Sequence, residues 1–111
     1  MRPTLLTLTL MLVPLAARAD DAKTARMWKT KCQSCHGADG KAQTDKGKKM
    51  QIFDMSAADW QAKKTDDDLK KAIKSGTRTE KDGVKKEMDA YDDLTDEQLS
   101  ALIAHIRSFK K

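Results

Sequence analysis

The residues best suited to chemistry are clustered in one pentapeptide, Cys32-Gln33-Ser34-Cys35-His36, which contains both cysteines of the chain. Two thiols three positions apart, followed at once by a histidine, form the C-x-x-C-H pattern of c-type haem attachment. In that chemistry each thiol adds across one vinyl group of haem, and the histidine becomes the proximal ligand of the iron. The pattern predicts one covalent haem c, attached through Cys32 and Cys35, with His36 as an axial ligand.

Other uses of the cysteine pair have less support in the sequence. A redox-active C-x-x-C pair usually lies where a strand meets a helix, which this sequence does not predict, and it does not require the histidine. A zinc site would need a second pair of ligands, but no further cysteine is present and the only other histidine is His105. A structural disulfide is compatible with an exported protein and stays open as an alternative.

The first nineteen residues have the pattern of a secretory signal peptide. Arg2 is followed by a mostly apolar stretch from Leu5 to Ala17, and Ala17-Arg18-Ala19 precedes Asp20. A basic start, an apolar middle and a small-x-small site are typical of a leader that is cleaved on export. We expect cleavage after Ala19, which leaves residues 20–111 as one domain in the periplasm. An uncleaved anchor is the alternative, but the stretch is short for a membrane span, so we expect no stable membrane anchor.

The composition favours a small helical domain. Charged residues make up 35% of the 111 residues and aromatic residues 5%, and the net charge of +5 falls to +3 without Arg2 and Arg18. We find no Gly/Ser-rich linker and no block of five or more like charges, which argues against a second domain and a basic nucleic-acid arm. Both prolines lie in the leader, and the proline-free remainder favours helix. So small a core benefits from a cofactor that completes it.

A helical pattern runs through most of the chain after the leader. We expect a first helix from Asp20 to about Lys31, with Asp20 or Asp21 as its N-cap, ending just before Cys32. Residues 77–87 are charged, and we expect them to be irregular because the chain has no alternation of period two. The sequence therefore predicts an all-α fold with three to five helices.

Three short patterns mark the starts of later helices. Ser56 and Thr65 are each followed three residues later by an aspartate, and Thr95 is followed by Gln98, an arrangement that caps helix N-termini. Gly76 is placed to end the second of these helices. The last helix has the i, i+3, i+4, i+7 spacing of an amphipathic face, formed by Leu99, Leu102, Ile103 and Ile106.

The iron of haem has a second axial position, for which four methionines follow the leader. Methionine there raises the reduction potential and suits electron transfer, whereas an open position favours ligand chemistry. Met27 is too close in sequence to the cysteines to reach the opposite haem face, and Met50 and Met55 are expected to pack beside the haem. Met88 is expected in a polar loop, residues 87–91, just ahead of the last helix, where packing explains an isolated methionine poorly. We predict Met88 as the distal ligand, with Met50, Met55 or His105 as alternatives.

These features resemble the class I c-type cytochromes, single-haem electron carriers, over nearly all of residues 20–111. The similarity rests on the attachment motif with the aromatic residue before it, on the segment after it and on several shorter matches: Trp28, Cys32–His36, Gly37–Gly40, Asp54–Ser56, Trp60, Leu69, Ile73, Gly76, Met88, Tyr91, Leu94–Leu99 and Ile106-Arg107. The resemblance implies a class I cytochrome c fold, in which the first and last helices cross near-perpendicularly and shorter helices surround one haem. It places Trp28 near the crossing and makes Met55, Trp60 and Tyr91 weaker candidates for haem packing, with Tyr91 also a candidate for bonding a propionate.

Three positions depart from the family pattern. Asp89 follows Met88 where the family often has proline, so the segment lacks the rigidity of a locked φ. The negative charge would also stabilise ferric iron and lower the potential. Thr24 stands where a small residue is common at the helix crossing, and His105 stands where an aromatic residue is frequent.

The resemblance implies a soluble monomeric electron carrier rather than an enzyme. Its partners would be a donor and an acceptor redox protein, and we expect no nucleic-acid partner. Lysines near the motif could steer a partner protein that has an acidic patch, or they could be ordinary solvated side chains. These lysines are Lys29, Lys31, Lys41, Lys46, Lys48 and Lys49. Two alternatives stay open, namely a haem module with an exchangeable distal ligand (peroxidase-like or gas-binding) and a dedicated subunit of an oxidase or dehydrogenase.

Overall fold

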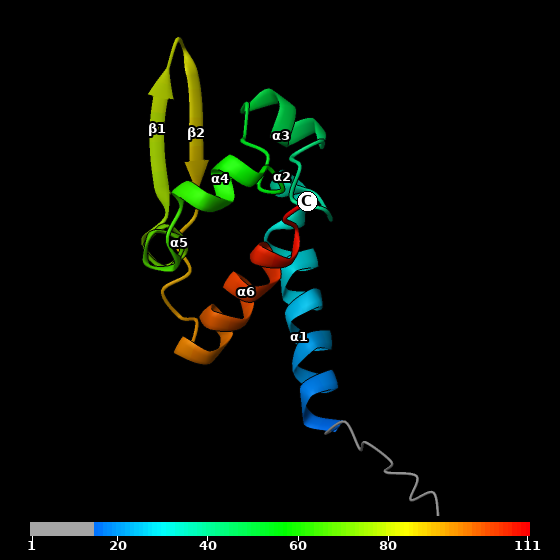
Figure 1. The fold of residues 1–111 in the computed structure, drawn as a ribbon. Coiled ribbons are helices and arrows are strands. Elements are labelled where there is room, and N and C mark those ends of the chain that lie inside the picture. Colours follow the sequence, from blue (N-terminus) through cyan, green and yellow to red (C-terminus); the bar gives the residue numbers. More distant parts are fainter. Residues whose placement is uncertain (1–14) are drawn as a thin grey trace, which may run out of the picture.

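The computed structural model describes residues 15–111, with side chains from Asp21 onward. Six helices and one two-stranded sheet follow one another along this part of the chain (Figure 1). In order they are α1 (Leu15–Lys31), α2 (Gln33–His36), α3 (Asp45–Lys49), α4 (Ala58–Lys63), α5 (Asp66–Ser75), β1 (Thr77–Lys81), β2 (Val84–Met88) and α6 (Asp96–Ser108). Most of the expected leader, residues 1–14, lies outside the described residues. None of the described helices is long and apolar enough to cross a membrane.

The core is built where α6 crosses α1 (Figure 1). Trp28 of α1 is only 3% exposed and packs with the apolar face that the sequence predicted for the last helix. Thr24, one turn earlier, is buried as well. The expected position of Trp28 near the crossing is therefore confirmed. The apolar face of α6 that covers it consists of Leu99, Leu102, Ile103 and Ile106.

Two of the three predicted caps are present, and one is wrong. Thr65 and Thr95 each form a complete capping box, with Asp68 and Gln98 as the reciprocal partners. Ser56 caps no helix, because α4 begins after Ala57. The Ser56 hydroxyl instead donates a hydrogen bond of 2.6 Å to Asp54 Oδ1. The Ser56 side chain thus bonds to Asp54, two residues earlier, instead of accepting hydrogen bonds from the backbone N–H groups of α4.

The start of the first helix also differs from the sequence prediction. Helix α1 begins at Leu15, so Asp20 and Asp21 lie inside it rather than at its N-cap. The residues from Leu15 to Ala19 are leucine, arginine and three alanines, all strong helix formers that extend the helix toward the N-terminus.

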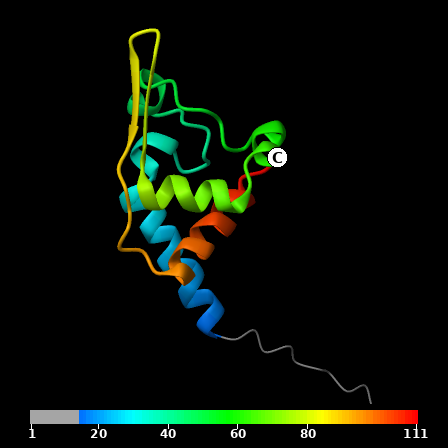
Figure 2. The ribbon, with the colours of Figure 1, turned by 90° about the vertical axis from the view of Figure 1, so that its left-hand side faces the viewer.

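The expectation of an all-α chain is wrong at residues 77–88, which form an antiparallel hairpin. Asp82 and Gly83 connect the strands with φ angles of 53° and 77°. Two positive φ angles are the mark of a type I′ turn, for which Asp-Gly is a preferred sequence. The hairpin projects beyond the helices in both views (Figures 1 and 2), and β1 is exposed along its whole length. Because neither face is fully buried, the strands lack the apolar alternation by which strands are usually found.

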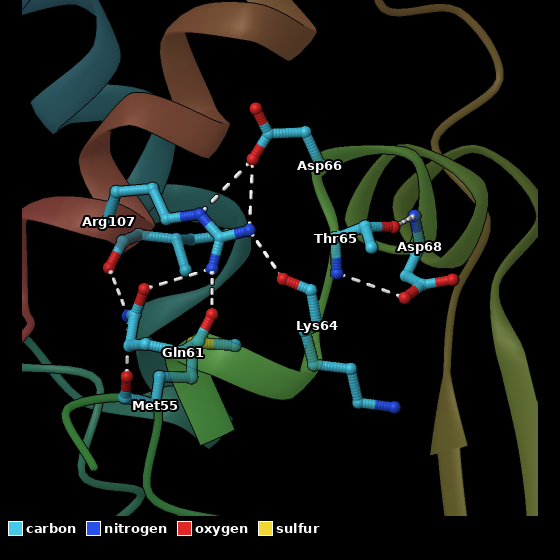
Figure 3. A network of polar contacts seen from close by, with 8 residues as sticks. Met55, Gln61, Lys64, Thr65, Asp66, Asp68 and Arg107 are labelled. Atoms are coloured by element: carbon cyan, nitrogen blue, oxygen red, sulfur yellow. Dashed lines mark hydrogen bonds and ion pairs between the residues drawn. The ribbon is translucent and has the colours of Figure 1, made fainter. Parts of the chain in front are cut away.

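A partly buried polar network joins the end of α6 to α4 and to the start of α5 (Figure 3). The Gln61 side-chain amide donates to the carbonyl oxygens of Met55 and Ile106, at 2.7 and 2.9 Å. The Arg107 guanidinium donates to both oxygens of Gln61, to the carbonyl of Lys64 and to Asp66 Oδ1. The network fixes the end of α6 against the loop that starts α5.

Replacing Arg107 with methionine keeps an unbranched apolar side chain in place of the aliphatic part of arginine and removes the guanidinium donors. We expect a loss of about 2 kcal/mol in the free energy of unfolding, because hydrogen bonds from a charged donor are lost and partly buried acceptors stay behind. Urea unfolding followed by far-ultraviolet circular dichroism measures it.

Arg78→Met is the matched control, because Arg78 and Glu87 form an exposed ion pair at 3.7 Å. Such a pair contributes roughly 0–1 kcal/mol. Equal losses for the two variants would contradict a structural role of the Arg107 network.

Candidate functional site

A cavity of about 480 Å³ brings together the residues that the sequence singled out. Cys32, Cys35 and His36 line it, and Met88 lines it from the end of β2. Its volume falls in the range of roughly 300–1,000 Å³ that is typical of cofactor and ligand sites. Its walls also include core side chains of three helices: Leu69, Ile73, Leu102 and Ile106 from α5 and α6, and Trp28 from α1.

The attachment motif is held by the end of α1 and the single turn of α2. The backbone N–H of His36 donates to the carbonyl of Cys32 at 3.0 Å, which keeps the two cysteines on one helical turn. Gly37 then ends the turn with a φ of 79°, a conformation that favours glycine. Trp28 Nε1 donates to the Gly37 carbonyl at 2.9 Å, so the motif is fastened directly to the helix crossing.

His36 is the most enclosed member of the motif, at 8% exposure. Its ring has the rings of Trp28 and Phe53 as neighbours, with centroids 6.0 and 6.3 Å away. Burial lowers the pKa of His36 below its usual value, so the imidazole is neutral at neutral pH. The neutral ring offers a nitrogen lone pair to a metal.

Comparisons with known proteins agree with this geometry. The Cytochrome c family model matches residues 22–110, a range that holds the motif and the last helix. The chain belongs to the cytochrome c family. Among solved structures, the c-type cytochrome KustC0563 is similar, with a TM-score of 0.65 and 32% identity, covering 79% of this chain and 98% of that chain. The search of curated proteins found no match. The resemblance to the class I cytochromes is thereby confirmed.

The cofactor of this cytochrome is a covalently bound haem c, and the cavity residues fit that group. Two buried polar atoms at the cavity, His36 Nδ1 and Trp60 Nε1, have no hydrogen-bond partner among the described residues. Buried polar groups are normally satisfied. Haem brings carboxylates, which accept hydrogen bonds from an indole N–H, and iron, which a histidine nitrogen can bind. An apolar macrocycle also matches a wall of aliphatic and aromatic side chains.

The state of the two cysteines is compatible with thioether formation. Cys32 and Cys35 are not joined in a disulfide in the described chain, which leaves the structural-disulfide alternative without support. Burial raises the pKa of Cys32 to about 11, with smaller effects of Lys31 and Cys35. Cys32 is therefore a thiol at neutral pH, and S–H is the group that adds across a vinyl bond. No cluster of three His, Cys, Asp or Glu residues that could hold a metal ion occurs in residues 15–111.

The candidates for the distal ligand differ in whether they line the cavity. Met50, Met55 and Met88 line the cavity, and Met55 is buried there at 6% exposure. Met27 packs against the hydrophobic core instead. His105 lies beside Trp28 at 5.3 Å and does not line the cavity, as a packing role predicts. Of the alternatives for the distal ligand, only the methionines after the motif lie at the cavity.

Trp60 and Tyr91 also line the cavity. Trp60 stacks on Phe53, with centroids 5.1 Å apart and the ring planes at 21°. The Tyr91 hydroxyl donates to the Lys31 carbonyl at 3.0 Å, so its one proton is directed at the end of α1. A contact between Tyr91 and a propionate stays a prediction.

Sequence reasoning missed the contribution of the hairpin to the cavity wall. Thr77 and Thr79 line the cavity together with their cross-strand partners Met88 and Lys86. Residues directly opposite in an antiparallel pair share one face, so these two pairs lie on the same face of the ribbon. The signal that could have revealed them is the Asp82-Gly83 dipeptide, which the search for alternation passed over.

Replacing both cysteines with serine tests the attachment. In wild-type protein we expect the haem to stay with the polypeptide after denaturation in acidified acetone, because thioether bonds do not depend on the fold. In the double variant we expect extraction to release essentially all haem. The measurement is haem absorbance in the precipitate and in the supernatant.

Ser34→Ala is the control, since Ser34 lies between the cysteines and supplies no thioether. Release of haem from the wild-type or the control protein would contradict covalent attachment.

Proposed function

We propose that this cytochrome is a soluble periplasmic electron carrier that transfers one electron at a time through haem c, with His36 and Met88 as axial ligands. The supporting observation is that one cavity is lined both by His36 of α2 and by Met88 of β2, which lie 52 positions apart in the chain. Cytochromes of this family are generally electron carriers rather than enzymes. Haem supplies an iron that changes between the ferrous and ferric states.

The protein's own part in this chemistry is to hold the ligands still and to set the surroundings of the iron. His36 is fixed by the motif turn and by packing against Trp28. A buried setting with ligands that do not change between redox states keeps the reorganisation on electron transfer small. Asp89 lines the cavity next to Met88, and its negative charge favours the ferric state.

Export is part of the proposal. The pattern of residues 1–19 supports a cleaved leader, and bacterial c-type haem is attached outside the cytoplasmic membrane. We further propose that the mature chain, residues 20–111, acts as a monomer, that it uses no nucleic-acid partner and that it has no stable membrane anchor.

Methionine–histidine ligation gives ferric cytochromes a weak absorption band at the red end of the visible spectrum. We expect Met88→Ala to abolish this band completely, because alanine has no sulfur to bind the iron. The measurement is the optical spectrum of the oxidised holoprotein.

Met50→Ala is the matched control, because Met50 also lines the cavity, and we expect it to keep the band. Survival of the band in Met88→Ala, or its loss in Met50→Ala alone, would show that another methionine is the ligand.

We propose that the partners of this cytochrome dock through acidic patches. Four lysines line the cavity, against three acidic residues. Lysines near the attachment motif attract the acidic patch of a partner locally and raise the rate of encounter. Three further lysines follow the motif, of which Lys41 is half-buried and the other two are exposed. The lysines that line the cavity are Lys31, Lys46, Lys64 and Lys86, and those that follow the motif are Lys41, Lys48 and Lys49.

The rate of electron transfer to an acidic redox protein should therefore depend on salt. We expect a fall of about tenfold between low and high ionic strength, as screening removes the attraction. Stopped-flow kinetics measures the second-order rate constant. Lys46→Gln should lower the low-salt rate, whereas Lys23→Gln, at an exposed position near the middle of α1 and outside the cavity wall, should not. A rate that does not change with salt would contradict steering by these lysines.

A further inference from the structure

Met88 is tied to the end of α5 through the hairpin. It is the last residue of β2 and pairs with Thr77, the first residue of β1. Thr77 directly follows Gly76, which caps α5. A Cβ atom on Gly76 would lie 2.6 Å from the carbonyl oxygen of Met88, so the chain after α5 and the Met88 segment pack backbone to backbone.

The other side of the Met88 segment is fastened as well. The backbone N–H of Tyr91 donates to the carbonyl of Ile73 at 2.9 Å, and Ile73 belongs to the buried core. The Tyr91 hydroxyl bonds to the Lys31 carbonyl. The chain is therefore held at Met88 by the strand pairing and, three residues later, by two hydrogen bonds from Tyr91 to α5 and α1.

The ladder decides which way Met88 faces. Thr77, Thr79, Lys86 and Met88 form the two hairpin pairs at the cavity. Along β2 the exposure alternates, with Lys86 and Met88 half-buried and Glu87 exposed, although Glu87 also reaches the edge of the cavity. A slip of the strand pairing by one residue turns every side chain of a strand to the other face. In a ribbon that buries neither face, apolar patterning specifies the register only weakly.

The turn is then the feature that fixes the register. Asp82 and Gly83 adopt the positive φ angles of a two-residue type I′ turn, and loop length with turn type sets hairpin register. Gly83 has φ of 77°, and a Cβ atom placed on it would meet no atom within 4 Å. A substitution there therefore acts through the backbone conformation alone.

We propose that Gly83 and the Asp82-Gly83 turn are remote positioning elements for the distal ligand: by fixing the hairpin register they keep Met88 on the cavity face. A proline after Met88 would stiffen the chain there by fixing its own φ angle, but residue 89 is an aspartate. The hairpin restrains Met88 in its place. The inference rests on the proposed ligation by Met88.

Gly83→Ala in the haem-loaded protein tests this role. Alanine disfavours the left-handed conformation, so the native register loses population and the sixth position opens more often. We expect the ferric protein to bind imidazole about tenfold more tightly. The left-handed conformation is disfavoured for alanine by roughly a factor of ten in the equilibrium constant, and the open form gains population by the same factor. The red absorption band should weaken in parallel.

Two controls accompany the variant. Gly83→Asn should keep wild-type imidazole affinity, because asparagine tolerates positive φ. Glu80→Ala should also keep it, because it changes an exposed hairpin side chain and leaves the turn intact. Far-ultraviolet melting of the helices should be close to wild type in all three variants.

The outcomes separate this inference from the proposed function. A wild-type protein without the band would overturn both, since Met88 would then not be the ligand. A band and an imidazole affinity that are unchanged in Gly83→Ala would overturn the positioning role alone. Loss of the band only together with melting of the helices would also overturn it, because the turn would then act on the whole fold.

Discussion

Trp28 is the side chain through which the fold and the site depend on each other. It is nearly fully buried where α1 meets α6, its indole N–H holds the Gly37 carbonyl, and its ring lies beside His36. The packing of the two long helices and the position of the attachment motif are therefore set by one residue.

The other helices and the hairpin enclose the cavity that the haem occupies. Aromatic residues make up only 5% of the sequence, and a domain of this size buries little apolar surface on its own. The helices contribute aliphatic side chains to the cavity, and the hairpin contributes Met88 from a strand end. Covalent haem then completes the core, so the same contacts that stabilise the chain also hold His36 and Met88, the proposed ligands of the iron.

The sequence predicted correctly those features that depend on interactions between residues close together in the chain. The motif, the capping boxes at Thr65 and Thr95 and the apolar face of α6 all depend on residues within one or two helical turns of one another. Ser56 failed as a cap because Asp54 competes for its hydroxyl. The hairpin was missed because β1 is polar and exposed throughout and β2 has apolar residues only at its two ends, so the turn dipeptide carries the clearest signal. That Met88 shares a cavity with His36 follows from tertiary packing, which spacing alone does not reveal.

Electron transfer by a six-coordinate haem is tested most directly by a potentiometric titration of the purified holoprotein, followed by its optical spectrum. One transition with a one-electron slope of about 59 mV per decade, low-spin six-coordinate spectra in both oxidation states and no rapid binding of carbon monoxide are expected. A five-coordinate, high-spin ferrous form that binds carbon monoxide at once would contradict closed His36–Met88 ligation and would favour ligand chemistry at an open site.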